Sequence, residues 1–263
     1  MMDELTRFFL VFVVGSVGQL MDGTLGMGFG VFSASMLLTA GFAPVAVVAT
    51  VNTAKILTGI FSGLAHWRAG NVRVGWLLPL IVPGIAGGVL GAHFLVSVPQ
   101  DRFRFWMALV LVLMGLFILC RCLFPGLFVR GSSQGESKVR WIRSLSLVIL
   151  GLAAGALNAS SGAYGPFATS GLMLITRAKT SRAVGTVNFA EIFVAASVIS
   201  TFLFKKGLHA PSWDLVLALV LGGALTAPLA AYACRKLPTK LLQLGVGLAL
   251  ISLNLRAVIS QLG

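Results

Sequence analysis

Two matched pairs of polar residues stand in the middle of long apolar stretches of this 263-residue chain. Asn52 is followed one helical turn later by Lys55, and Asn188 is followed at the same spacing by Glu191. An ionisable side chain within a membrane helix is costly and usually serves a function. We therefore expect Lys55 to attract an anion and Glu191 to carry a proton. A purely structural Lys55–Glu191 ion pair is the alternative.

Two stretches rich in Gly and hydroxyl residues interrupt the apolar sequence: QLMDGTLGMGFG at 19–30 and ALNASSGAYGP at 156–166. A helix that breaks at membrane depth frees backbone polar groups, which is tolerated where the break lines a cavity. The half-helix that follows then presents N–H donors and the positive end of its dipole, both of which suit an anion. Corresponding breaks in two halves of a chain indicate a transporter's substrate site. Close helix packing through small residues is the alternative.

The predicted substrate site combines these breaks with the polar positions on the neighbouring helices. Its expected members are Thr24, Gly26, Met27, Gly28, Asn52, Lys55, Ser160, Ser161, Gly162, Ala163, Tyr164 and Asn188, with Glu191 as the proton-coupling residue. Asp22 is expected to cap the half-helix after the first break rather than to bind a cation. The spacing assembles no zinc cluster, catalytic triad or Walker loop, so we expect no metal, no cofactor and no enzymatic activity.

The composition indicates that this chain lies in a lipid bilayer rather than in water. Hydrophobic residues make up 57% of it and charged residues only 10%, whereas soluble domains have about 25% charged residues. The formal net charge of +13 comes mostly from Lys and Arg in short gaps between apolar runs, as the positive-inside rule expects. The expected partners are therefore the lipid bilayer and a small anionic substrate, not nucleic acid, and a homodimer is left open.

A membrane-spanning helix needs about 20 apolar residues, and this length divides the chain into ten apolar segments. They are 5–21, 27–40, 45–67, 75–98, 103–123, 141–157, 167–176, 183–204, 213–234 and 241–259. The short segments 27–40 and 167–176 are interpreted as broken or re-entrant half-helices. The predicted fold is an all-α polytopic membrane protein with eight to ten membrane segments.

The two halves of the chain correspond in the order of their segments, which indicates an internal repeat. The tripeptide Thr-Val-Asn at 50–52 recurs at 186–188, and Asp22 and Gly26 correspond to Asn158 and Gly162. We therefore expect a first transmembrane repeat at 1–123, a linker at 124–140 and a second repeat at 141–263. The distribution of Lys and Arg favours inverted repeats, with the linker in the cytoplasm and both termini outside.

The pattern resembles the TauE/SafE membrane permeases, also called the sulfite exporter family. The resemblance rests on LMDGTLGMGFG at 20–30, ATVNTAK at 49–55 and RAGNVR at 68–73, and it covers nearly the whole chain as two repeats. Met27 and Phe29 interrupt a run that is richer in glycine in that family. The resemblance implies export or uptake of small sulfur-containing anions or organic acids, such as sulfite, sulfonates or sulfoacetate, across the inner (plasma) membrane.

Three functions are compatible with these features. The first is a secondary transporter for such an anion, driven by the substrate gradient or by protons. The second is a passive anion channel, which would share the breaks but need no proton carrier. The third is a membrane partner in the assembly of a metal or respiratory enzyme, for which Cys120, Cys122 and the eight Met residues would supply soft ligands.

Overall fold

The computed structural model describes residues 3–124, 138–207, 211–233 and 239–259. These residues form ten α-helices and, within the same ranges, no strand. The helices are α1 (Glu4–Leu25), α2 (Phe29–Thr39), α3 (Pro44–Arg68), α4 (Val74–Val96), α5 (Gln100–Leu123), α7 (Lys138–Ser161), α8 (Tyr164–Thr176), α9 (Thr180–Lys206), α10 (Trp213–Ala233) and α11 (Thr239–Ile259). The predicted all-α fold is confirmed.

The distribution of side chains is that of a membrane protein. Large apolar side chains such as Leu78, Phe94 and Phe204 point outward, whereas polar side chains such as Asn52 and Asn158 are fully buried. Seven of the helices in the described ranges are long and apolar enough to cross a membrane, and shorter apolar helical stretches lie at 29–39 and 213–227. The outer surface is therefore suited to lipid, and the polar groups gather between the helices.

The helices lie close to the predicted segments but differ at the breaks, where α1 and α7 extend further than predicted, α2 begins later and α8 begins earlier. The prediction ends the first segment at Met21, but α1 continues to Leu25 because its last polar residues are hydrogen-bonded within it. Thr24 Oγ1 donates to the Leu20 carbonyl oxygen at 2.7 Å, and α1 ends only where Gly26 adopts a left-handed conformation. The prediction starts the short second-half segment at 167, but α8 begins earlier, at Tyr164.

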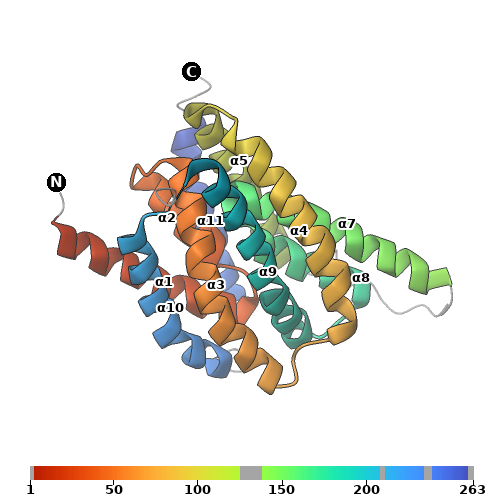
Figure 1. Ribbon diagram of the computed structural model, residues 1–263. Helices are drawn as coiled ribbons and strands as arrows, with labels where there is room; N and C mark the ends of the chain where they lie inside the picture. Colours follow the sequence, from red (N-terminus) through yellow and green to blue (C-terminus); the bar gives the residue numbers. More distant parts are fainter. Residues whose placement is uncertain (1–2, 125–137, 208–210, 234–238, 260–263) are drawn as a thin grey trace.

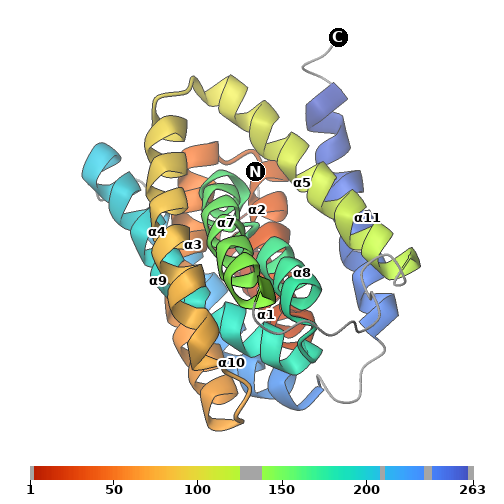
Figure 2. The ribbon, with the colours of Figure 1, turned by 90° about the vertical axis from the view of Figure 1, so that its right-hand side faces the viewer.

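Helices from the two halves of the chain pack against each other in pairs (Figures 1 and 2). The closest pairs are α1 with α10, α4 with α7, α3 with α9, and α5 with α11. Glycines permit the close approach: a Cβ on Gly15 of α1 would lie 2.6 Å from the Leu219 carbonyl oxygen of α10. On α7, a Cβ on Gly151 would lie 2.8 Å from the Leu80 carbonyl oxygen of α4. These glycines serve helix packing.

These pairs are related by exchange of the two halves of the chain. The exchange converts the pair α1 with α10 into α7 with α4, and it leaves the pairs α3 with α9 and α5 with α11 unchanged. Two hydrogen bonds follow the same relation. Thr186 Oγ1 accepts from the Arg73 backbone N–H at 3.0 Å, and Thr50 Oγ1 accepts from the Ser212 backbone N–H at 2.9 Å. The internal repeat and its inverted orientation stay predictions, and most of the predicted linker, 125–137, lies outside the described residues.

Candidate functional site

The two Gly-rich stretches form two breaks between consecutive helices. The first break, Gly26–Gly28, separates α1 from α2, and the second, Gly162–Ala163, separates α7 from α8. Gly26 and Gly162 both adopt left-handed conformations, with φ of 66° and 71°, which a side chain would strain. The α2 helix has 11 residues and α8 has 13, so each is about 16–20 Å long and too short to span a bilayer.

The two breaks meet in the interior of the protein. The Gly162 backbone lies against that of Gly30, in the first turn of α2, so closely that a Cβ on Gly162 would be 3.2 Å from Gly30 Cα. Thr169 Oγ1 of α8 donates to the Gly26 carbonyl oxygen at 2.9 Å. Stretches from opposite halves of the chain therefore form one contiguous site.

Lys55 of α3 places its ammonium group at this junction. Lys55 Nζ donates to the Gly162 carbonyl oxygen at 3.0 Å and to Asn158 Oδ1 at 3.3 Å. It also forms a buried ion pair with Glu191 Oε1 of α9. Because all three partners are acceptors, the ammonium group is held by one negative charge and two polar oxygens in a buried environment.

The asparagines of α3 and α9 extend this network unequally. Asn158 Nδ2 donates to Asn52 Oδ1 at 2.7 Å, and Asn52 Nδ2 donates to the Val48 carbonyl oxygen, so both Asn52 side-chain atoms are paired. Asn188 Nδ2 donates to Ser62 Oγ at 3.2 Å. The buried Asn188 Oδ1 has no hydrogen-bond partner among the described residues.

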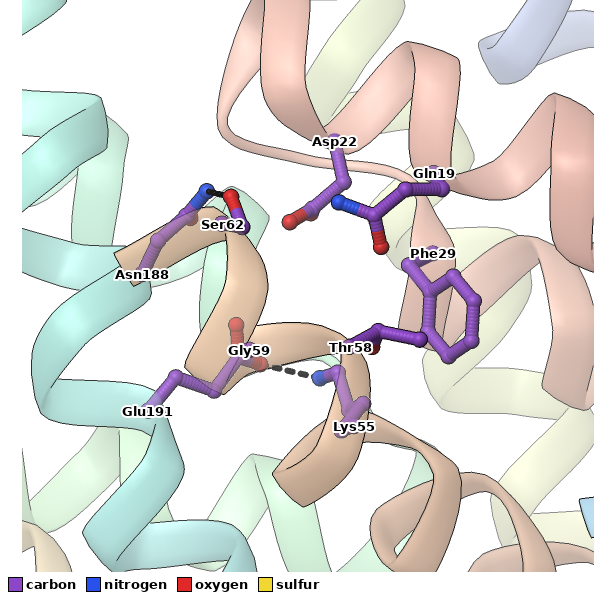
Figure 3. A pocket seen from close by; sticks show the side chains of 9 residues that line it. All are labelled: Gln19, Asp22, Phe29, Lys55, Thr58, Gly59, Ser62, Asn188 and Glu191. Atoms are coloured by element: carbon purple, nitrogen blue, oxygen red, sulfur yellow. Dashed lines mark hydrogen bonds and ion pairs between the residues drawn. The ribbon is translucent and has the colours of Figure 1, made fainter. Parts of the chain in front are cut away.

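A small polar cavity lies between α1, α3 and α9, next to the ion pair (Figure 3). The cavity is lined by Gln19, Asp22, Phe29, Lys55, Thr58, Gly59, Ser62, Asn188 and Glu191. About 10 Å³ is available to the centre of a water molecule, which is about the space that one buried water needs. The charged groups at its wall are two carboxylates and one ammonium, so the cavity carries an excess negative charge when all three are ionised.

Comparison with known proteins identifies the family. The family model described as "Sulfite exporter TauE/SafE" matches residues 11–257. The chain belongs to the TauE/SafE family. It is a multi-pass membrane transporter, as its seven long apolar helices also indicate, and the inner membrane predicted for it fits this family.

Two relatives in Bacillus subtilis (strain 168) are similar to this TauE/SafE protein. The probable membrane transporter protein YtnM is 34% identical over 252 residues, which cover 94% of this chain and 81% of YtnM. The probable membrane transporter protein YdhB is 30% identical over 141 residues, which cover 52% of this chain and 55% of YdhB. No solved structure matches the chain significantly.

The TauE/SafE fold brings some of the predicted site residues together and leaves others apart. Lys55, Asn188 and Glu191 line the cavity. Gly162 accepts a hydrogen bond from Lys55 Nζ, and Asn52 accepts one from Asn158. The remaining predicted residues do not line it. They are Thr24, Gly26, Met27, Gly28, Ser160, Ser161, Ala163 and Tyr164.

The two serine hydroxyl groups among these residues are hydrogen-bonded within their own helix. Ser160 Oγ and Ser161 Oγ donate to the Leu157 carbonyl oxygen, which lies within their own helix. The buried Tyr164 hydroxyl has no hydrogen-bond partner among the described residues. Met27 is buried and lies 4.0 Å, Sδ to Nη1, from Arg121 of α5.

Sequence reasoning missed Gln19, Thr58 and Ser62 as lining residues. Thr58 and Ser62 follow Lys55 by three and seven positions on α3, and Gln19 precedes Asp22 by three positions on α1. A search for polar residues at helical spacing around each ionisable residue would have found them. Asp22 is predicted as a cap of α2; its carboxylate lies near the Phe29 backbone N–H at the start of that helix, and it also lines the cavity.

The cysteines that supported a role in metal assembly lie apart from this site. Cys120 is exposed and Cys122 is buried near the end of α5. The described residues contain no group of three or more His, Cys, Asp or Glu side chains arranged to hold a metal ion.

Proposed function

We propose that this TauE/SafE transporter moves a small sulfur-containing or organic anion, such as sulfite, a sulfonate or sulfoacetate, with proton coupling. The observation that carries the proposal is the position of Lys55. Its ammonium group binds the Gly162 carbonyl oxygen of the second break and lies beside Gly30, just after the first break. A buried cation where two broken helices meet is suited to an anion that must cross the membrane.

The breaks supply further donors for such an anion. The Phe29 backbone N–H at the start of α2 faces the Asp22 carboxylate, and α8 begins at Tyr164 beside the same junction. The first backbone N–H groups of a helix have no partner within it and carry the positive end of the dipole. The buried Tyr164 hydroxyl adds an O–H donor near Glu191.

Glu191 provides the means of coupling. An anion that binds Lys55 competes with the Glu191 carboxylate for the same ammonium group. Glu191 becomes unpaired as the anion arrives, and a buried carboxylate without a partner is costly unless it takes up a proton. Anion binding and protonation of Glu191 therefore favour each other, which is the property that a proton-coupled carrier needs.

The size of the cavity supports a carrier rather than an open channel. Space for about one water molecule lies beside the ion pair, which is less than sulfite or a sulfonate requires. The site must enlarge before it binds such an anion, and movement of the helices around a central site would open it to either side.

Uptake by proteoliposomes that contain the purified protein tests this function. Sulfite, thiosulfate, sulfoacetate and small carboxylates are offered with and without an inward proton gradient. We expect at least one of these anions to accumulate, and Lys55→Met to lose uptake. Lys206→Met, at the exposed end of α9, removes the same charge outside the site and should retain uptake. Full uptake by Lys55→Met would refute the binding role of Lys55.

A further inference from the structure

Asp22 is the second carboxylate of the cavity, and the ion pair leaves it uncompensated. Lys55 pairs with Glu191, and Asp22 takes part in no ion pair among the described residues. The side chain is buried. The charged groups that face it are Glu191 of α9 and Lys55 of α3. From α2 only Phe29 reaches the cavity, and α10 contributes no lining residue; its Ala230 instead contacts Gly23 of α1.

Asn188 faces the same cavity with an acceptor that is not used. Asn188 Oδ1 has no partner among the described residues, although its side chain is buried and its Nδ2 binds Ser62. Figure 3 shows Asp22 pointing into the cavity from α1, and Asn188 of α9 at the left of the cavity with its amide nitrogen on Ser62. A buried carbonyl oxygen without a donor is unfavourable, so a donor at the cavity wall would stabilise this site.

The corresponding position in the other half of the chain shows what that donor does. Asn158 corresponds to Asp22, and Asn52 corresponds to Asn188. Asn158 Nδ2 donates to Asn52 Oδ1 at 2.7 Å. An ionised Asp22 has no hydrogen to donate, whereas a protonated carboxyl group has one O–H donor. Protonation of Asp22 would therefore provide for Asn188 the bond that Asn158 provides for Asn52.

We propose that Asp22 is the proton-loading site of this transporter. A proton from the aqueous side binds one Asp22 carboxylate oxygen, forms an O–H bond and donates to Asn188 Oδ1. The two carboxylates and one ammonium group then sum to zero charge, so an anion meets no net repulsion when it approaches Lys55. As the anion displaces Glu191 from Lys55, the proton passes from Asp22 to Glu191, and it leaves with the anion on the other side.

A proton fits these groups better than a metal cation does. The described residues contain no group of three or more His, Cys, Asp or Glu side chains arranged to hold a metal ion, and the Lys55 ammonium group at the same wall would repel one. A proton needs one oxygen that binds it, which Asp22 provides, and one acceptor for the resulting O–H donor, which Asn188 Oδ1 provides. The inference rests on the proposed anion transport, because the proton has a purpose only if an anion follows it.

The test compares Asp22→Asn with the wild type in two measurements. Asn at position 22 keeps an oxygen for the Phe29 N–H and an amide donor for Asn188, but it binds no proton. In proteoliposomes we expect an inward proton gradient to raise wild-type accumulation at least about tenfold and to leave Asp22→Asn unaffected. Asp214→Asn, which changes an exposed carboxylate paired with Arg7, should respond as the wild type does.

Two results in the transport assay would overturn the proposal. One is a proton response of Asp22→Asn equal to that of the wild type, which would leave Asp22 only a structural cap. The other is accumulation driven by a sodium gradient and lost in Asp22→Asn, which would make the site a sodium site. As a second variant, Asn188→Ala removes the acceptor and should move the midpoint of the wild-type pH profile toward lower pH. An unmoved midpoint would also overturn the proposal.

Melting curves in detergent between pH 5 and pH 8 separate this inference from the transport function. Protonation of Asp22 stabilises the folded cavity, so the melting temperature of the wild type should fall as the pH rises, and that of Asp22→Asn should fall less. If no tested anion is transported, the proposed function fails while this comparison still decides the role of Asp22. Equal pH dependence in both proteins would refute the proton site.

Discussion

Gly30 and Gly162 are in direct backbone contact, although they belong to opposite halves of the chain. Gly30 lies in the first turn of α2, Gly162 lies in the second break, and the Lys55 ammonium group is beside both. Because neither position carries a side chain, the two breaks can approach each other, and the Lys55 ammonium group can lie next to both.

Gly30→Ala should therefore destabilise the protein and lower its transport activity. Its Cβ would overlap the Gly162 carbonyl oxygen and Lys55 Nζ and lie 2.8 Å from Lys55 Cε. Overpacking of this kind costs about 1–3 kcal/mol, more than the gain of about 1 kcal/mol from Ala in a helix. Gly245→Ala on α11, where a Cβ meets no atom within 4 Å, should melt at or above the wild-type temperature. A Gly30→Ala protein as stable and active as Gly245→Ala would contradict this packing.

The hydrogen bond between Asn158 and Asn52 should show as energetic coupling. Each asparagine leaves a buried partner group unsatisfied when it is replaced alone, at a cost of about 1–3 kcal/mol. Asn52→Ala and Asn158→Ala together should cost less than the sum of the single changes, with a coupling energy of about 0.5–3 kcal/mol. Chemical unfolding of the four proteins in detergent measures it. Additive effects would show that the 2.7 Å contact contributes little.

Most of the fold was readable from the sequence because the bilayer imposes a fixed segment length. Ten apolar runs were predicted, and ten helices are observed among the described residues. The ends at the breaks were less predictable. Thr24 reads as a helix breaker in water, yet it is satisfied within α1 by the Leu20 carbonyl oxygen. The sequence gives no sign of this local pairing.

The candidate site was only partly predictable, and for a physical reason. Lys55 and Glu191 are conspicuous because a charge in an apolar segment is rare, and both line the cavity. Ser160 and Ser161 were included for their hydroxyl groups, but the Leu157 carbonyl oxygen is within their reach and accepts from both. Which polar groups face the cavity depends on helix rotation, which a single residue type does not determine.

The two buried threonines of the repeated Thr-Val-Asn sequence should have similar importance for stability. Thr186→Val leaves the Arg73 backbone N–H without its acceptor, and Thr50→Val does the same to the Ser212 backbone N–H. We expect each change to cost about 1–3 kcal/mol. In Thr201→Val the lost hydroxyl donates to Ser197 within its own helix, so the cost should be below about 0.5 kcal/mol. Thermal melts of the three variants test this, and equal melting temperatures would refute the anchoring role of Thr50 and Thr186.

The Lys55–Glu191 pair can be examined by removing one charge and then both. Lys55→Met leaves Glu191 buried without its cation and should cost about 3–5 kcal/mol, the typical penalty for breaking a buried pair. The double variant Lys55→Met with Glu191→Gln removes both charges of the pair and leaves only the Asp22 carboxylate at the cavity wall, so it should regain most of that stability. Arg7→Met with Asp214→Asn is the matched control, because this pair has 41% and 51% of its side chains exposed. Its loss should cost about 0–1 kcal/mol.

Transport by the same double variant decides between a structural and a functional pair. If the pair only joins α3 to α9, the double variant should transport as soon as its stability is restored. If Lys55 binds the anion and Glu191 responds to it, uptake should remain at background in a protein that melts near the wild-type temperature. We expect the second result, because Lys55 Nζ contacts the second break through the Gly162 carbonyl oxygen, and neither Met nor Gln restores a positive charge at that junction.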